Sequence, residues 1–157
     1  MPMSAQDALT PSLLDRRILI IDDEPSNVLL LESLLTREGF ANLTSVTDPL
    51  QAVDTFIACD PHIVLLDLMM PGIDGYALLE ALRRLTIGKF RPILVLTADK
   101  TAAARHRALA LGAKDFVTKP LDLVEVVLRV TNLLETSLLY DALTQARGET
   151  LPAEPVP

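Results

Sequence analysis

Three aspartates stand at the ends of two short aliphatic segments. Asp22 and Asp23 follow residues 18–21, and Asp67 follows residues 63–66. Short unbroken aliphatic runs are typical of parallel strands that are buried on both faces. Because ligands bind beyond the carboxyl ends of parallel strands, the three acids are predicted to converge on one site. Close carboxylates repel one another, and oxygen ligands suit Mg²⁺, so the sequence predicts a magnesium-binding acidic pocket.

Two further polar residues stand at the ends of predicted strands. Thr97 ends the segment ILVLT, and Lys119 follows DFVT and precedes Pro120. A hydroxyl and a compact ammonium beside the acids are the groups that a phosphoryl group on Asp67 needs. Each residue is weak evidence by itself, since a strand-end threonine and a solvated lysine are common. The five residues taken together are a much stronger signal.

The elements that must position these residues alternate along the chain. Strands are predicted at about 17–22, 42–46, 63–67, 92–97 and 115–118. Helices are predicted to begin near Pro25, after Asp48-Pro49, near Asp74-Gly75, near Lys100 and after Pro120. This alternation predicts an α/β fold with five βα units.

The fifth predicted helix is longer than a crossover requires. Asp122 is its expected N-cap, and no stop signal occurs before Gly148. Its expected apolar stripe contains six residues: Val124, Val127, Val130, Leu134, Leu138 and Ala142. The stripe predicts either a partner for the extension or a helix that folds back on its own domain.

The composition limits the classes of function. The 157 residues suffice for one domain, and the formal net charge of −7 argues against nucleic-acid or anionic-membrane partners. No apolar segment reaches the ~18 residues that a membrane span needs. Cys59 is the single cysteine, which excludes an intramolecular disulfide and fits a cytoplasmic protein. Residues 1–15 are expected to form a flexible tail and residues 149–157 a disordered one.

The ordered set of motifs resembles the receiver domain of two-component response regulators, of the chemotaxis-regulator type. It comprises Asp22-Asp23, Asp67 with Met70-Pro71-Gly72 and Asp74-Gly75, Thr97-Ala98 and Lys119-Pro120. The resemblance covers about residues 16–135, with residues 136–148 as an extension of the fifth helix. It implies a flavodoxin-like five-stranded parallel sheet in the order 2-1-3-4-5, with five helices.

The resemblance also implies roles for the residues. Asp67 is the expected phosphoacceptor, receiving a phosphoryl group from a sensor histidine kinase or a phosphotransfer protein, with Lys119 neutralising charge. Asp23 is expected to bind Mg²⁺ directly and Asp22 largely through water. The backbone carbonyl of Met69 completes the protein ligands.

The resemblance implies that four positions control the conformational change on phosphorylation and the lifetime of the phosphate on Asp67. Thr97 is expected to move to the new phosphate, and Phe116 aligns with the switch aromatic, although many family members have tyrosine there. An ordinary half-buried strand phenylalanine is the other interpretation of Phe116. Met69 and Asp99 align with the positions that tune phosphate loss, and slow-to-moderate self-dephosphorylation is expected. Asp99 either holds a water molecule or caps the fourth helix.

The sequence says less about what the predicted receiver domain controls. Outside the receiver motifs there is no helix-turn-helix, basic patch or catalytic motif, so no enzymatic turnover is expected. One hypothesis is a stand-alone receiver that pairs as a homodimer through Leu134, Leu138 and Ala142. The other is a piece of a larger regulator, because residues 129–139 resemble the connector to cyclic-dinucleotide phosphodiesterase domains. An unphosphorylated scaffold is a third possibility.

Two functions outside this family fit the residues less well. A phosphatase of the haloacid dehalogenase type needs a second aspartate two residues after the acceptor, where Met69 stands. A nucleotide- or flavin-binding module needs a loop rich in glycine, serine or threonine. The loop here begins with Asp22-Asp23-Glu24 and would repel a phosphate group unless a metal intervened.

Overall fold

The computed structural model describes residues 13–148, and its centre is one parallel sheet. Its strands are β1 (Arg17–Ile21), β2 (Asn42–Val46), β3 (Ile63–Asp67), β4 (Ile93–Thr97) and β5 (Asp115–Thr118). They lie in the order β2-β1-β3-β4-β5, with every neighbouring pair parallel. The predicted flavodoxin-like topology is therefore confirmed.

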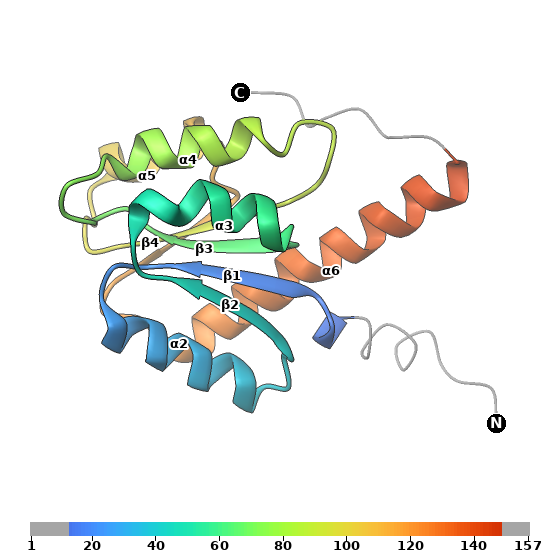
Figure 1. Ribbon diagram of the computed structural model, residues 1–157, viewed down its shortest axis with the longest axis horizontal. Helices are drawn as coiled ribbons and strands as arrows, with labels where there is room; N and C mark the ends of the chain where they lie inside the picture. The colour runs from blue at the N-terminus through green and yellow to red at the C-terminus, as the bar shows by residue number, and fades with distance from the viewer. Residues whose placement is uncertain (1–12, 149–157) are drawn as a thin grey trace.

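Helices cover both faces of the sheet (Figure 1). They are α2 (Pro25–Arg37), α3 (Ala52–Cys59), α4 (Gly75–Arg84), α5 (Ala102–Ala110) and α6 (Leu123–Arg147), with a short 3-10 turn η1 (Pro49–Gln51) before α3. Residues of α3, α4 and α5 share one buried cluster with Leu19, Val64 and Val95. Residues of α2 and α6 share the other with Ile18 and Leu65. Neighbouring strand residues thus point to opposite cores, which explains the unbroken aliphatic runs.

The chain before β1 belongs partly to the core. Leu13 and Leu14 begin the described residues and contact the cluster on the α2 and α6 side. The backbone N–H of Ala41 donates a hydrogen bond to the carbonyl of Leu14 at 3.1 Å. The part of the expected tail that can be described, residues 13–15, is therefore attached to the domain. Residues 1–12 of that expected tail lie outside the described residues, as does the expected disordered segment 149–157.

Helix α6 is long, as predicted, but it turns a different stripe toward the sheet. Val126, Val130, Leu134 and Ser137 are buried, whereas Val124 is 68% exposed. The predicted stripe was wrong at Val124, whereas Ala142 is exposed on the extension, for which a separate partner was expected. The valines of the first two turns allow two overlapping stripes, and only packing against the sheet selects between them.

No helix of the described residues is long and apolar enough to cross a membrane.

Candidate functional site

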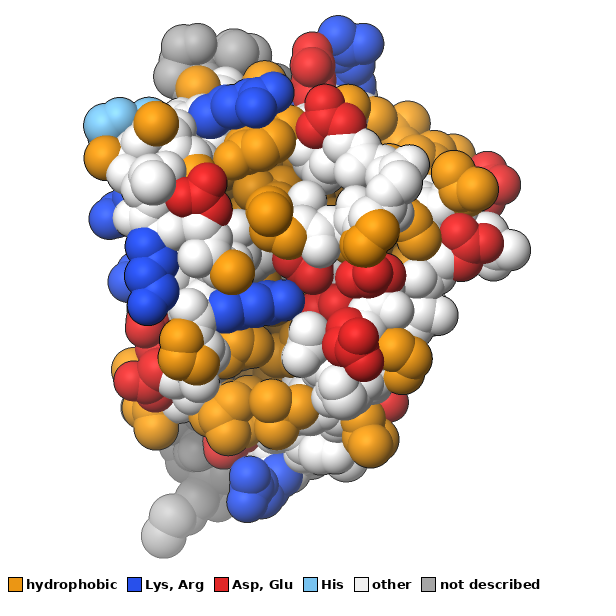
Figure 2. All heavy atoms as spheres, turned by 90° about the vertical axis from the view of Figure 1, so that its left-hand side faces the viewer, with side chains coloured by type: hydrophobic (Ala, Val, Ile, Leu, Met, Phe, Trp, Pro, Cys, Tyr) orange, Lys and Arg blue, Asp and Glu red, His pale blue; other side chains and the backbone are white. Residues whose placement is uncertain are grey.

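Three carboxylates meet beyond the carboxyl ends of β1 and β3. The register pairs Ile21 with Leu66, so the residue after each lies at the same edge of the sheet. Asp22, Asp23 and Asp67 each offer an oxygen within 4.8 Å of the other two. Figure 2 shows this end of the molecule, where acidic side chains gather beside a basic one. The structure therefore brings together the acids that the sequence singles out.

Asp22 is the most constrained of these acids. Its Oδ1 accepts a hydrogen bond from the Glu24 N–H at 3.0 Å, but its buried Oδ2 accepts none. Burial raises the pKa of Asp22, and repulsion from Asp67 adds to the rise, while Glu24, Lys119 and Asn27 oppose it. A buried carboxylate oxygen without a donor fits a cation ligand, and three carboxylates fit Mg²⁺ in particular. The residues present therefore fit the metal that the family implies.

Lys119 places a positive charge beside the carboxylates of this site. Its Nζ lies 3.3 Å from Oδ2 of Asp67 and 3.6 Å from Oδ2 of Asp22. The Lys119 N–H donates to the carbonyl of Thr97 at 2.7 Å, which ties the end of β5 to the end of β4. The ammonium is thereby held beside the two buried carboxylates.

Asp67 is presented by a turn whose shape depends on a glycine. Its Oδ1 accepts the Met69 N–H at 3.0 Å. The turn ends at Asp74, which caps α4 by accepting from the backbone of Tyr76 and Ala77. A Cβ on Gly75 would lie 2.2 Å from the carbonyl oxygen of Leu68, so only glycine allows this close approach. The Asp74-Gly75 pair therefore fixes the path of the chain from Asp67 back to α4.

Thr97 and Phe116 lie on neighbouring strands, where Val95 pairs with Phe116 and Thr97 with Thr118. Both side chains are buried, and Phe116 belongs to the cluster on the α3, α4 and α5 side. The hydroxyl of Thr97 accepts the Asp99 N–H at 3.2 Å. Phe116 thus faces inward in this structure.

The two residues expected to tune phosphate loss lie in different surroundings. Met69 is 60% exposed at the mouth of the site. The carboxylate of Asp99 accepts the Thr101 N–H at 3.0 Å, and the hydrogen bonds from Thr101 lower the pKa of Asp99. Thr101, not Asp99, caps α5 by accepting from Ala104. Asp99 therefore orders the turn that leads into α5.

One contributor was missed by the sequence analysis. Asn27, in the first turn of α2, lies near Asp22, and its side chain lowers the pKa of that carboxyl group. An asparagine inside a helix carries no sequence signal of its own, although its position five residues after Asp22 is compatible with the contact.

The residues predicted for a dimer contact lie away from this site on α6. Leu134 is fully buried in its own domain, Leu138 is half-buried and Ala142 is exposed. A contact through Leu134 is excluded in this conformation, because the side chain already packs among Val126, Val130 and the strands.

The fold and the pocket define a flavodoxin-like α/β domain with a site of three carboxylates and one lysine at the carboxyl edge of its sheet. Comparison with known sequences identifies its family: residues 18–131 match the family model of the response regulator receiver domain. The chain therefore belongs to the receiver domain family of two-component systems.

Known relatives and solved structures support this assignment. The chain is 38% identical over 129 residues to the response regulator PleD of Caulobacter vibrioides, which covers 82% of this chain and 28% of PleD. It is 40% identical over 118 residues to the transcriptional activator protein IrlR of Burkholderia pseudomallei, covering 75% of this chain and 50% of IrlR. The receiver domain of the Francisella response regulator 1452 superposes with a TM-score of 0.71 at 25% identity, covering 78% of this chain and 98% of that one. The chain thus spans between about a quarter and a half of these curated relatives.

Proposed function

We propose that this protein accepts a phosphoryl group on Asp67 from a phosphohistidine of a sensor kinase or a phosphotransfer protein. The P–N bond to histidine breaks as an Asp67 oxygen bonds to phosphorus, and the histidine nitrogen takes up a proton. The observation that carries the proposal is the position of Lys119, whose ammonium lies 3.3 Å from the Asp67 carboxylate. A fixed cation at that point offsets charge on the transferring group.

Mg²⁺ is the cofactor that we propose for this transfer. Asp22, Asp23, Asp67 and the backbone carbonyl of Met69 would hold it, and it would supply positive charge to the phosphoryl oxygens. The buried Oδ2 of Asp22, which accepts no hydrogen bond, supports this part of the proposal. Asp22 and Asp23 then hold the metal, while Asp67 is the group that becomes modified.

Phosphorylation is proposed to act through Thr97 and Phe116. The Thr97 hydroxyl would donate to the new phosphate, giving up its present geometry with the Asp99 N–H. Phe116 is already inward, so the ring has space in that position before phosphorylation. Because phenylalanine lacks a hydroxyl, a partner would recognise the change in shape and not a new hydrogen bond from this ring.

We propose slow-to-moderate self-dephosphorylation. The Asp99 carboxylate is engaged by Thr101, and Met69 cannot orient water, so neither residue favours hydrolysis. A phosphate half-life of seconds in the purified protein would contradict this proposal.

The output is proposed to be control of a partner in the cytoplasm or of a homodimer through α6. The dimer contact is revised to the exposed side of the helix, with Leu138 and Ala142 joined by Leu139 and Leu143 in place of Leu134. Light scattering on protein treated with beryllofluoride at tens of micromolar tests this, and a persistent monomer would contradict it. Because the curated relatives are longer, a larger regulator with a cyclic-dinucleotide phosphodiesterase output is the alternative.

Phosphoacceptor activity is tested with acetyl phosphate and Mg²⁺, followed by intact-mass measurement. The unmodified sequence should gain the mass of one phosphoryl group, and Asp67→Asn should gain none. If neither protein gains mass, the unphosphorylated scaffold becomes the better account. Sustained hydrolysis of small phosphate esters would instead favour a phosphatase.

A further inference from the structure

A groove of about 420 Å³ lies between the loop before β4 and the last turns of α6. The loop contributes Ile87, Gly88, Lys89 and Arg91, and α6 contributes Tyr140, Asp141, Thr144 and Gln145. The α6 residues come after residue 131, where the match to the receiver family ends. This groove is therefore built by the helical extension and is separate from the acidic pocket at the opposite edge of the sheet.

Arg91 is a groove residue whose buried guanidinium has an unused hydrogen-bond donor. Its side chain is only 13% exposed, and its one ion pair with a described residue joins Nη2 to Oδ2 of Asp60 at a long 3.8 Å. Its buried Nη1 has no hydrogen-bond partner. A guanidinium carries five N–H donors, and a buried donor without an acceptor is unfavourable. A hydrogen-bond acceptor supplied by a ligand would therefore stabilise the Arg91 side chain, since the described residues provide none for Nη1.

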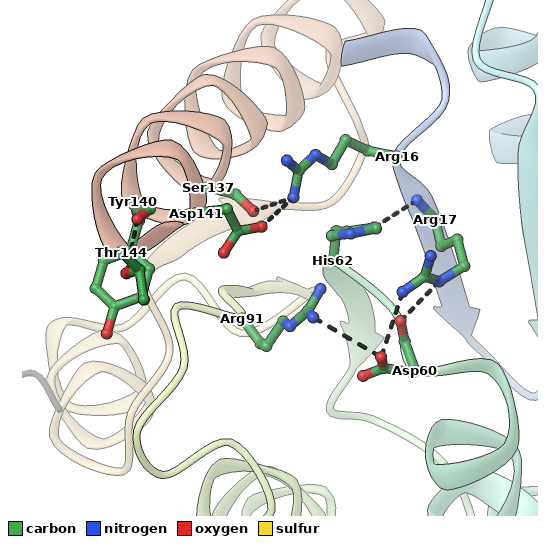
Figure 3. Close-up of polar contacts among 9 residues, drawn as sticks. All are labelled: Arg16, Arg17, Asp60, His62, Arg91, Ser137, Tyr140, Asp141 and Thr144. Carbon is green, nitrogen blue, oxygen red and sulfur yellow. Dashed lines mark hydrogen bonds and ion pairs between the residues drawn. The ribbon is translucent and has the colours of Figure 1, made fainter. Parts of the chain in front are cut away.

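The surroundings carry a surplus of positive charge (Figure 3). Arg16 is paired with Asp141, while Arg17 and Arg91 share Asp60. Lys89 is exposed and forms no ion pair with a described residue. Four cations thus face two carboxylates, in a chain whose net charge is −7. His62 does not change this balance at neutral pH, because burial and the neighbouring arginines lower its pKa to about 4.

We propose that this groove binds a small molecule through an oxyanion, either a phosphate or a carboxylate group. Lys89 and Arg91 would donate to the oxyanion, and the Gln145 amide lines the same groove. Since Nη1 is covered in the free protein, Arg91 turns from its long contact with Asp60 when the ligand binds. Ile87 and the Tyr140 ring provide an apolar wall for an organic body. The volume falls within the range of small-molecule sites.

The test is titration of the unmodified sequence, without divalent metal, with inorganic phosphate or citrate, followed by amide NMR. Without metal, the three carboxylates of the acidic pocket repel anionic probes, so that pocket should not bind them. Saturable shifts are expected at Gly88, Lys89 and Gln145, and they should be absent with chloride at matched ionic strength. Saturation by phosphate identifies the bare anion as sufficient, whereas saturation by citrate alone identifies an organic ligand.

Matched variants decide whether the groove is responsible. Arg91→Gln and Lys89→Gln should each weaken binding about tenfold, the effect of losing one charge-assisted hydrogen bond. Arg84→Gln is the control, because Arg84 is exposed and paired with Glu80 on α4. Lys89→Gln changes an exposed residue, so it tests the site even if Arg91→Gln fails to fold. Shifts that do not saturate, or affinities equal in all three variants, would overturn the proposal. Neither result bears on phosphorylation of Asp67.

Discussion

The two edges of the sheet carry opposite charge and differ in how they are built. At the carboxyl edge, Asp22, Asp23 and Asp67 form an acidic pocket around one lysine. At the amino edge, Arg16, Arg17 and Arg91 surround His62, and their ion-pair partners among residues 13–148 are Asp60 and Asp141. The first cluster lies within the family match, and the second depends on Arg16 and α6 residues outside it. The acidic edge thus lies wholly within the family match, and the basic edge lies partly outside it.

The largest expected difference between the edges comes from removing one cation at each and comparing the rates of phosphorylation. Lys119→Ala should slow phosphorylation by acetyl phosphate roughly 100-fold, because a preorganised charge at the transferring group is lost. Arg91→Gln should leave the rate unchanged, since Arg91 lies at the other edge. The rates are measured by intact mass over time. Equal loss in both variants would show that the edges act as one site.

Mg²⁺ should stabilise the folded protein, and this effect should depend on residues of the acidic edge and not on those of the basic edge. At a concentration of 100 times its Kd, the metal should raise the free energy of unfolding by about 2.7 kcal/mol. Asp22→Asn should reduce this gain, whereas Asp141→Asn should keep it. Thermal denaturation with and without Mg²⁺ measures the gain, and an undiminished gain in Asp22→Asn would remove that residue from the metal site.

The basic edge should respond to loss of its better-buried ion pair. Arg16 is 12% exposed and donates from Nη1 to Oδ2 of Asp141 at 2.5 Å and to the Ser137 hydroxyl at 3.3 Å. Asp141→Asn should cost about 1–2 kcal/mol, less than a fully buried pair because Asp141 is 41% exposed. Glu80→Gln, which breaks the exposed pair with Arg84, should cost under about 0.5 kcal/mol. Urea denaturation compares the two variants, and equal costs would show that the Arg16–Asp141 pair contributes no more than an exposed pair.

The last prediction concerns the pH dependence of stability at the basic edge. His62 accepts the Arg17 N–H through Nδ1, and its pKa falls from 6.5 to about 4, mainly through burial, with repulsion from Arg16, Arg91 and Arg17 opposed by Asp141. The unfolded chain therefore binds a proton that the folded chain does not, and stability should fall as pH falls from 6.5 to 4. His62→Gln should flatten that part of the profile.

His106 provides the control for that measurement, because it is the other histidine and lies exposed on α5. His106→Gln should leave the slope unchanged. A slope that survives in His62→Gln would assign the pH dependence to other groups.

The two edges also differ in what the sequence could reveal. The acids, Thr97 and Lys119 were predictable because each stands at a strand end, and parallel strands bring their carboxyl ends to one edge. Arg17, His62 and Arg91 stand at or just before the amino ends of β1, β3 and β4, but Asp60 follows α3 and Asp141 lies late in α6, where no strand end marks them. Their meeting depends on how far α6 extends and on its rotation. The stripe of α6 was wrong for the same reason, since its valines allow two faces.

The length of helix α6 amplifies small movements at its start. It begins at its cap Asp122, soon after Lys119 at the acidic edge, and Arg16 holds it at Asp141. At 1.5 Å per residue these points lie roughly 29 Å apart, so a tilt of about 5° at the first turn moves Asp141 by roughly 2.5 Å. That displacement is enough to separate a hydrogen-bonded ion pair. A small shift near Lys119 would therefore decide whether the ion pair between Arg16 and Asp141, at the far end of the helix, is intact or broken.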